Sequence, residues 1–261
     1  MAFETLNLEV VEGVAYLTLN RPDVRNALSG QMISELHQAA DRLEADRSLR
    51  CVVLAGAGPM FCAGGDLNWM KAQIKADRPT RILQGLSLAK MLQALNSLTL
   101  PVIAKIHGGA FGGGVGLACC CDHVFASDTS KFGLTETKLG LIPATIGPYV
   151  AARLGDGAAR QIFMSSQVFD AARAQSLGIV SQTVAPDQLH RTVAKQVAAY
   201  QNVAPNAARA SKALVQSLGP QITEEMIRST VEKLADTWEG EEALAGIDAF
   251  LSKVPPPWAK D

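Results

Sequence analysis

The first twenty residues alternate between apolar and polar positions in two short runs. Leu6 to Val10 forms the first run, Val14 to Leu19 forms the second, and Glu12-Gly13 lies between them. Alternation with a period of two is typical of strands with one buried face, and a glycine between two such runs favours a tight turn. The sequence therefore predicts a β-hairpin at residues 6–19.

Continuous apolar runs and helical patterns then follow one another along the chain. A short continuous apolar run indicates a strand buried on both faces, and apolar residues three and four positions apart indicate an amphipathic helix. Their alternation over residues 1 to about 185 predicts an α/β fold with parallel strands. The predicted strands are Cys51 to Ala55, Pro101 to Ile106 and Val124 to Ala126, and the predicted helices are residues 31–45 with Ser29 as cap, 82–95, 112–121, and 171–177 between the cap Asp170 and Gly178.

The pattern changes after about Pro186, where only helical periodicity remains. No strand-like run interrupts it, so we expect a separate helical region at residues 187–261. Amphipathic helices that follow a complete α/β unit need a surface to cover, and we expect this region to mediate self-association. The predicted helices are Leu189 to Tyr200, Ala207 to Leu218, Thr223 to Trp238 and Glu241 to Ser252.

Composition and charge exclude several classes of protein. The 261 residues include 24 Lys+Arg and 25 Asp+Glu, and a net charge of -1 removes the long-range electrostatic reason to expect nucleic acid or an anionic membrane as partner. The longest apolar stretch, Gly108 to Cys121, is shorter than the roughly 20 residues of a membrane-spanning helix. The N-terminus shows no secretory or transit signal, so we expect a soluble, cytoplasmic protein.

Motifs for metals, nucleotides and covalent catalysis are absent from the sequence. It contains no CxxC pair, P-loop, GxGxxG, HExxH or GxSxG motif, and its four histidines are scattered. Three of the five cysteines are adjacent, at residues 119–121, and the odd count argues against a disulfide framework. What remains is chemistry that needs neither a metal nor a bound redox cofactor.

Two glycine-rich turns each follow a predicted buried strand. The first is Phe61 to Leu67 and the second is His107 to Gly114. Glycine lets backbone N–H groups approach a ligand closely, and two N–H groups from separate turns can form an oxyanion hole. The alternative is that these glycines only allow tight turns.

Six short motifs follow one another along nearly the whole chain. They are Asn20-Arg21-Pro22, Asn26-Ala27-Leu28, Phe61 to Leu67, Gly112-Gly113-Gly114, Phe132-Gly133-Leu134-Thr135-Glu136 and Gly140-Leu141-Ile142-Pro143. Together they resemble the enoyl-CoA hydratase/isomerase (crotonase) family. The resemblance implies a crotonase-like spiral of ββα units with the active site in residues 1–186, and a C-terminal helical region in residues 187–261 that joins subunits into a homotrimer or a dimer of trimers.

The resemblance also implies an acyl-CoA substrate and a set of site residues. No separate cofactor is expected, because coenzyme A is part of the substrate. The two backbone N–H groups that stabilise an enolate map onto Gly65 and Gly113, and the catalytic glutamate maps onto Glu136. The coenzyme A contacts map onto Val24, Arg25, Ala27, Ala63, Gly65, Asp66 and Leu67.

Glu136 stands in an apolar stretch that includes Phe132, Leu134 and Leu141. Apolar surroundings disfavour the charged carboxylate, so we expect its pKa to be raised towards the range useful for proton transfer. The alternative is a surface glutamate paired with Lys138.

The sequence departs from the family pattern in two places. Gly116 stands where hydratases of the family usually carry a second glutamate, and we expect it to leave space for a bulky or polar acyl group. Residues 144–149 replace a glycine-rich turn, and Tyr149 is a candidate for holding water. Lys138 and Arg153 are candidates for a distal substrate carboxylate.

The combination of residues 112–117 and 141–146 with Asp66 to Met70 looks like the bacterial methylglutaconyl-CoA hydratase branch, which serves leucine catabolism. This resemblance favours hydration of a branched or carboxylated 2-enoyl-CoA. The single glutamate leaves open a double-bond isomerase, and a non-catalytic binding protein of the same fold is a third reading.

Overall fold

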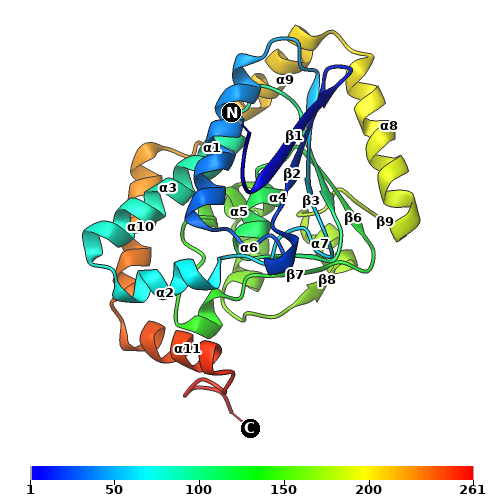
Figure 1. Ribbon diagram of the computed structural model, residues 1–261. Helices are drawn as coiled ribbons and strands as arrows, with labels where there is room; N and C mark the ends of the chain where they lie inside the picture. The colour runs from blue at the N-terminus through cyan, green and yellow to red at the C-terminus, as the bar shows by residue number, and fades with distance from the viewer. Residues whose placement is uncertain (1, 261) are drawn as a thin grey trace.

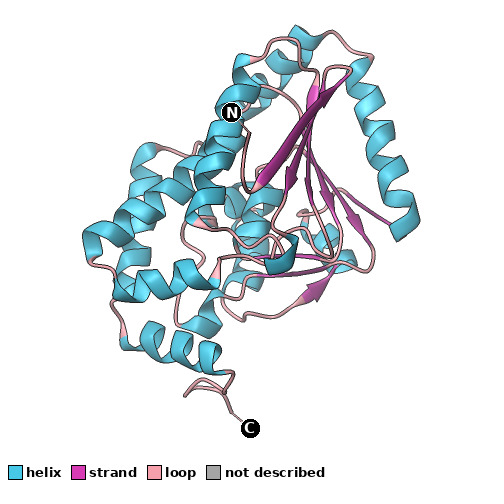
Figure 2. Ribbon diagram, viewed as in Figure 1, coloured by secondary structure: helices cyan, strands magenta, loops and turns pink. Residues whose placement is uncertain are grey.

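A six-stranded sheet forms the centre of the molecule in the computed structural model, which describes residues 2–260 (Figures 1 and 2). Its strand order is β1-β2-β3-β4-β6-β9. β1 and β2 form the predicted antiparallel hairpin, and every other neighbouring pair is parallel. The strands are β1 (Leu6–Val11), β2 (Val14–Leu19), β3 (Cys51–Gly56), β4 (Val102–Ile106), β6 (His123–Ser127) and β9 (Gln182–Val184).

Helices cover both faces of this sheet. Figure 1 shows α1 (Gly30–Ala45) and α3 (Arg78–Asn96) on one side and α8 (Leu189–Gln201) on the other. In β3, Val52 and Leu54 belong to the main core, whereas Val53 packs with the apolar residues of α8. The strands predicted from continuous apolar runs are therefore buried on both faces, as expected. Ser29 caps α1 by accepting a hydrogen bond from the N–H of Met32 at 3.2 Å, also as expected.

A second, three-stranded sheet was not predicted from the sequence. Its order is β5-β7-β8, and no strand in it exceeds three residues. A run this short carries no readable alternation of apolar and polar positions, which explains why the pattern missed it. The strands are β5 (Gly109–Phe111), β7 (Lys131–Gly133) and β8 (Phe169–Asp170).

Short helices lie in the connections between the strands of both sheets. Asp170 caps one of them through the N–H of Arg173, and Gly178 ends it with a φ of 89°, as the sequence predicts. The pattern missed three others, α2, α5 and α6. These helices are α2 (Leu67–Lys75), α4 (Gly113–Cys119), α5 (Gly147–Leu154), α6 (Asp156–Phe163) and α7 (Ala171–Leu177).

The last part of the described chain is helical, as predicted. After α8 it forms α9 (Pro205–Leu218), α10 (Glu224–Trp238) and α11 (Glu241–Ser252). α10 packs against α3, and α11 packs against a 3₁₀ turn, η2 (Glu136–Leu139). Figure 1 shows α11 at the lower end of the molecule, beneath α2. Within residues 2–260, no helix has the length and apolar character needed to cross a membrane. The division at residue 186 remains a prediction.

Candidate active site

The two glycine-rich turns predicted from the sequence lie side by side. They leave the carboxyl ends of β3 and β4, which are neighbouring parallel strands, so both emerge at the same edge of the sheet. An isolated β-bridge joins Cys62 in the first turn to Ala110 in the second. The N–H of Phe111 donates to the carbonyl of Cys62 at 3.0 Å. The tertiary structure therefore brings together two segments that lie about fifty residues apart.

Glycine allows these turns to approach one another. Gly64 and Gly112 have φ angles of 94° and 47°, a region that side chains rarely adopt. A Cβ at Gly64 would lie 3.1 Å from the carbonyl oxygen of Phe111. The N–H groups of Gly65 and Gly113 donate no hydrogen bond to any residue that the structure describes. Both donors are left unused by the fold and can serve a ligand.

Glu136 lies beside the second glycine turn. It is the first residue of η2, and its Oε1 would be 3.0 Å from a Cβ at Gly112. Its Oε2 is buried and has no hydrogen-bond partner among the described residues. Burial raises the pKa of this carboxyl to about 7, as the apolar sequence context predicts, and its own backbone N–H opposes the shift.

The alternative of a surface glutamate paired with Lys138 is wrong. Lys138 is exposed, and Glu136 forms no ion pair within residues 2–260. A carboxylate desolvated without a cation is costly to maintain and is a frequent mark of a functional site.

The two segments predicted to contact coenzyme A are also neighbours. The N–H of Ala63 donates to the carbonyl of Arg25 at 3.0 Å, which joins the loop of Val24, Arg25 and Ala27 to the first glycine turn. Val24 is exposed at 44% and Leu67 at 47%, whereas Ala27 is buried. The exposed residues lie on the surface where a long ligand could contact both segments.

Asn26 holds this loop in place and was missed as a site residue. Its φ is 55°, and its buried side chain donates to the carbonyls of Ala57 and Met60, each at 2.8 Å. The loop of Val24 to Ala27 is therefore tied directly to the segment that follows β3. The signal in the sequence was the place of Asn26 in one of the six motifs, four residues after Pro22.

Asp66 has a structural environment. Its carboxylate forms an ion pair with Arg21 at 2.9 Å and accepts hydrogen bonds from the N–H groups of Asn68 and Trp69, so it caps α2. Burial disfavours the ionised form, but the bonds from Arg21, Trp69 and Asn68 outweigh it and lower the pKa. The carboxylate is committed to the fold, where it caps α2 and pairs with Arg21.

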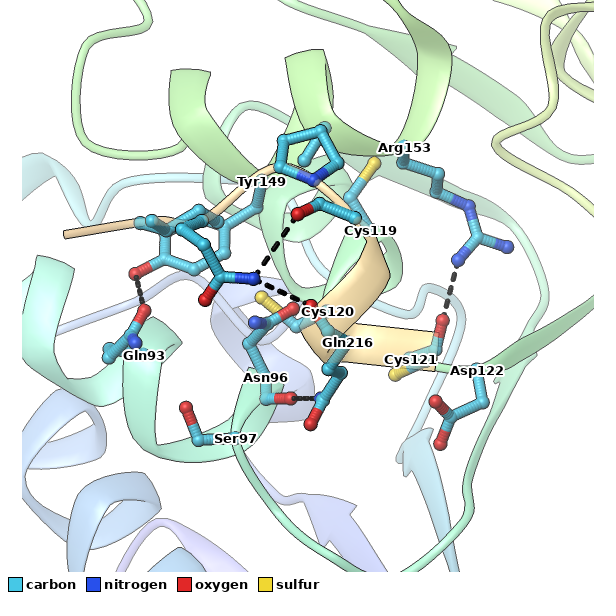
Figure 3. Close-up of a pocket in the computed structure, with 15 residues that line it drawn as sticks. Gln93, Asn96, Ser97, Cys119, Cys120, Cys121, Asp122, Tyr149, Arg153 and Gln216 are labelled. Carbon is cyan, nitrogen blue, oxygen red and sulfur yellow. Dashed lines mark hydrogen bonds between the residues drawn. The ribbon is translucent and has the colours of Figure 1, made fainter. Parts of the chain in front are cut away.

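Tyr149 and Arg153, two candidate site residues, line a cavity that does not include Glu136. A cavity of about 380 Å³ is lined by Tyr149 and Arg153, and by residues 119–122 after the far end of the helix that Gly113 begins (Figure 3). The hydroxyl of Tyr149 donates to Gln93 Oε1, and the Arg153 guanidinium donates to the carbonyls of Cys121 and Gly178. The expectations that Tyr149 holds catalytic water and that Arg153 holds a substrate carboxylate are therefore wrong.

The space expected beside Gly116 is occupied. A Cβ at Gly116 would lie 2.5 Å from Cγ2 of Ile146, and Gly116 itself is buried. The expectation that this position leaves room for an acyl group is wrong, because Ile146 fills it.

All five cysteines are buried free thiols. Desolvation raises the pKa of Cys62, Cys119 and Cys121 to about 12, which keeps these thiols protonated at neutral pH. They fit the expectation of small buried side chains rather than nucleophiles.

These features define an α/β enzyme whose site combines two unused backbone donors with one desolvated carboxylate. Comparison with known proteins gives the family: residues 9–261 match enoyl-CoA hydratase/isomerase, and the chain belongs to it. The crotonase fold inferred from the motifs is confirmed by solved structures that cover almost the whole chain.

Three similar proteins illustrate the match. An enoyl-CoA hydratase/isomerase structure from Marinobacter aquaeolei is 38% identical with a TM-score of 0.79, covering 98% of this chain and 100% of that one. An enoyl-CoA hydratase structure from Shewanella pealeana is 34% identical with a TM-score of 0.81, covering 98% and 96%. A crotonyl-CoA hydratase from Syntrophomonas wolfei is 29% identical over 255 residues, 97% of each chain.

Proposed function

We propose that this enzyme adds water to a 2-enoyl-CoA thioester, with a branched or carboxylated acyl group as the preferred substrate. The observation that carries the proposal is Glu136, whose buried, unpartnered Oε2 and raised pKa suit transfer of a proton at neutral pH. The preference for a branched acyl group rests on the motif resemblance alone.

One carboxylate suffices for this reaction. Ionised Glu136 accepts a proton from water while the water oxygen bonds to the β-carbon of the substrate. The electron pair of the double bond moves to the thioester oxygen, and the N–H groups of Gly65 and Gly113 stabilise the resulting enolate. Glu136 then donates the proton to the α-carbon, so that the elements of water have been added and the carboxylate is regenerated.

A second function, double-bond isomerisation, is favoured by Gly116. Where a two-glutamate hydratase would carry its second carboxylate, this chain has a glycine packed against Ile146. An isomerase needs only one carboxylate, which takes a proton from the γ-carbon or the α-carbon and returns it to the other. The same enolate stabilisation serves both reactions.

The coenzyme A part of the substrate would bind where Val24, Arg25 and Ala27 adjoin the first glycine turn. The contact between Ala63 and Arg25 supports this location, and the exposed side chains of Val24 and Leu67 offer apolar surface. In this arrangement the Asp66 carboxylate does not bind coenzyme A itself, because it is paired with Arg21. Asp66 contributes to the binding surface indirectly, by holding the first glycine turn.

Self-association is supported by the reversed orientation of α9. Its charged face points inward: Lys212 pairs with Asp122 at 2.7 Å, and Arg209 is buried. Its apolar side chains Leu214 and Leu218 point outward, at 60% and 78% exposure. An outward apolar helix face is suited to contact with another subunit, and a homotrimer or dimer of trimers is the proposed assembly.

The deciding experiment offers the purified protein a series of enoyl-CoA esters and identifies the products by mass spectrometry. Straight, branched and carboxylated 2-enoyl esters, together with a 3-enoyl ester, cover the alternatives. A product heavier by one water supports hydration, and an ester of unchanged mass whose proton NMR spectrum shows a shifted double bond supports isomerisation. Absence of both products with every ester would refute the proposal.

A further inference from the structure

The backbone that follows Glu136 lies directly against α11. Gly140 ends η2 with a φ of 67°, and a Cβ at Gly140 would lie 2.6 Å from the backbone nitrogen of Ala243. Reciprocally, a Cβ at Gly246 would lie 2.6 Å from the carbonyl carbon of Leu139. Each glycine therefore accommodates the backbone of the other segment, and neither position has room for a side chain.

The contact involves one face of the helix. Ala243 and Gly246 are three residues apart and so lie on the same side of α11. The segment Leu139-Gly140 crosses this side, and no side chain separates the two backbones. A small displacement of α11 must therefore displace the turn that carries Glu136.

The same face of α11 also supports the first glycine turn. Ala243 and Ile247 are fully buried in a cluster with Leu141 and Met70. Met70 lies in the first turn of α2, and its Cγ would be 3.8 Å from a Cβ at Gly65. One helix thus stands behind the segments that present Glu136 and Gly65.

The opposite side of η2 is held as well. The hydroxyl of Ser166 forms a hydrogen bond with that of Thr137 and accepts one from the N–H of Lys138 at 3.1 Å. Since Ser166 fixes one side of the turn, pressure from α11 cannot be relieved by simple translation away from the helix.

We propose that Gly246 is a positioning residue for Glu136: the absence of a side chain at residue 246 lets α11 seat the turn so that the Glu136 carboxylate reaches Gly112. This inference rests on the proposed role of Glu136 in proton transfer. It assigns a catalytic consequence to a helix near the end of the chain, more than one hundred residues from the carboxylate.

The test compares Gly246→Ala with Gly157→Ala. Both glycines lie in helices, where alanine is the better helix former, but a Cβ at Gly157 meets no atom within 4 Å. We expect Gly246→Ala to lower kcat by about 10-fold to 100-fold, as small misplacements of catalytic groups do, with KM nearly unchanged. Gly157→Ala should match the parent protein in both quantities.

A second readout follows the carboxyl itself. Displacing the turn should admit water to Oε2, so the pKa of Glu136 should fall from about 7 towards its ordinary value. ¹³C NMR titration of labelled glutamate measures this pKa without any turnover, and the Glu136 signal is the one missing from Glu136→Gln. An unchanged kcat and pKa in Gly246→Ala would overturn the inference.

Two controls separate the possible failures. If Glu136→Gln keeps normal turnover, the proposed function fails. If Glu136→Gln loses turnover but Gly246→Ala changes neither kcat nor the pKa of Glu136, only the positioning role fails. If Gly246→Ala does not fold, Ile247→Ala is the second variant, because it loosens the same face of α11 by removing most of a buried side chain. It should lower kcat and the pKa of Glu136 in the same direction, and an Ile247→Ala protein that is folded and unaltered in both would refute the inference.

Discussion

Gly116 in α4 packs directly against Ile146, which precedes α5. A Cβ at Gly116 would lie 2.5 Å from Cγ2 and 2.9 Å from Cβ of Ile146, and Leu92 closes the same space from α3. The two positions at which this sequence departs from the family pattern, residue 116 and the segment 144–149, are therefore in contact. A glycine at 116 and an isoleucine at 146 are complementary in volume, because the Ile146 side chain fills the space that a side chain at 116 would need.

We expect Gly116→Ala to destabilise the protein. Helix propensity alone would favour alanine, but overpacking a full core costs about 1–3 kcal/mol of the free energy of unfolding. Ile146→Ala removes Cγ2, so the double variant should lose less than the sum of the single ones. Urea denaturation of the four proteins measures this coupling, and additive losses would show that the two residues are not in contact.

Glu136→Gln should abolish nearly all turnover while the fold and acyl-CoA binding persist. Loss of a general acid–base group typically lowers the rate by about 10²–10⁴-fold, and glutamine preserves the size of the side chain. Steady-state kinetics measure the loss of turnover, and calorimetry with a saturated acyl-CoA ester measures whether binding persists. Near-normal turnover in the variant would exclude Glu136 from proton transfer.

The pH dependence of kcat should show a rise centred near 7. Burial raises the pKa of Glu136 to about 7, so the carboxylate that accepts a proton is depleted below this pH. The ionised form is the one that burial disfavours, so the fold loses stability as pH rises from the ordinary glutamate pKa of 4.5 to the raised pKa of about 7. Glu136→Gln should therefore gain more stability over the parent at pH 8 than at pH 4. A flat kcat profile from pH 5.5 to 8 would contradict the raised pKa.

Asp66→Ala should reduce stability at neutral pH. The carboxylate caps α2 and pairs with Arg21, and loss of a cap costs about 0.5–2 kcal/mol. Because the pKa of Asp66 is lowered in the folded state, its contribution is present above the ordinary value of 3.8 and disappears as pH falls through the folded value. Thermal unfolding at pH 7 and pH 3 should show a difference between the two proteins that shrinks in acid.

Leu218→Glu should disrupt self-association. This side chain is 78% exposed on α9, so the change costs little within one subunit but places a charge in the proposed contact. Leu83→Glu, at 65% exposure on α3, is the matched control. Sedimentation should show smaller particles for Leu218→Glu alone. A monomeric parent protein, or equal behaviour of both variants, would argue against the α9 contact.

The local patterns were sufficient for the long elements. Alternation predicted the hairpin of β1 and β2, and apolar periodicity predicted α1 and the four helices after residue 186, because an apolar face leaves a readable period in a segment of a dozen residues. Caps such as Ser29 were also readable, since a cap is decided by residues three positions apart. The motifs placed Glu136 beside the glycine turns through resemblance to a family.

Only the tertiary structure decided what those residues touch. Tyr149 and Arg153 look suited to a site by residue type, yet the packing of α5 turns both towards a different cavity. Gly116 suggests open space in the sequence, but Ile146, thirty residues away, fills it. The sequence alone determined the hairpin of β1 and β2 and the long helices, since a readable period depends on neighbours along the chain. Contacts between Glu136, Gly112 and α11 depend instead on how distant backbones pack, and no local pattern encodes that distance.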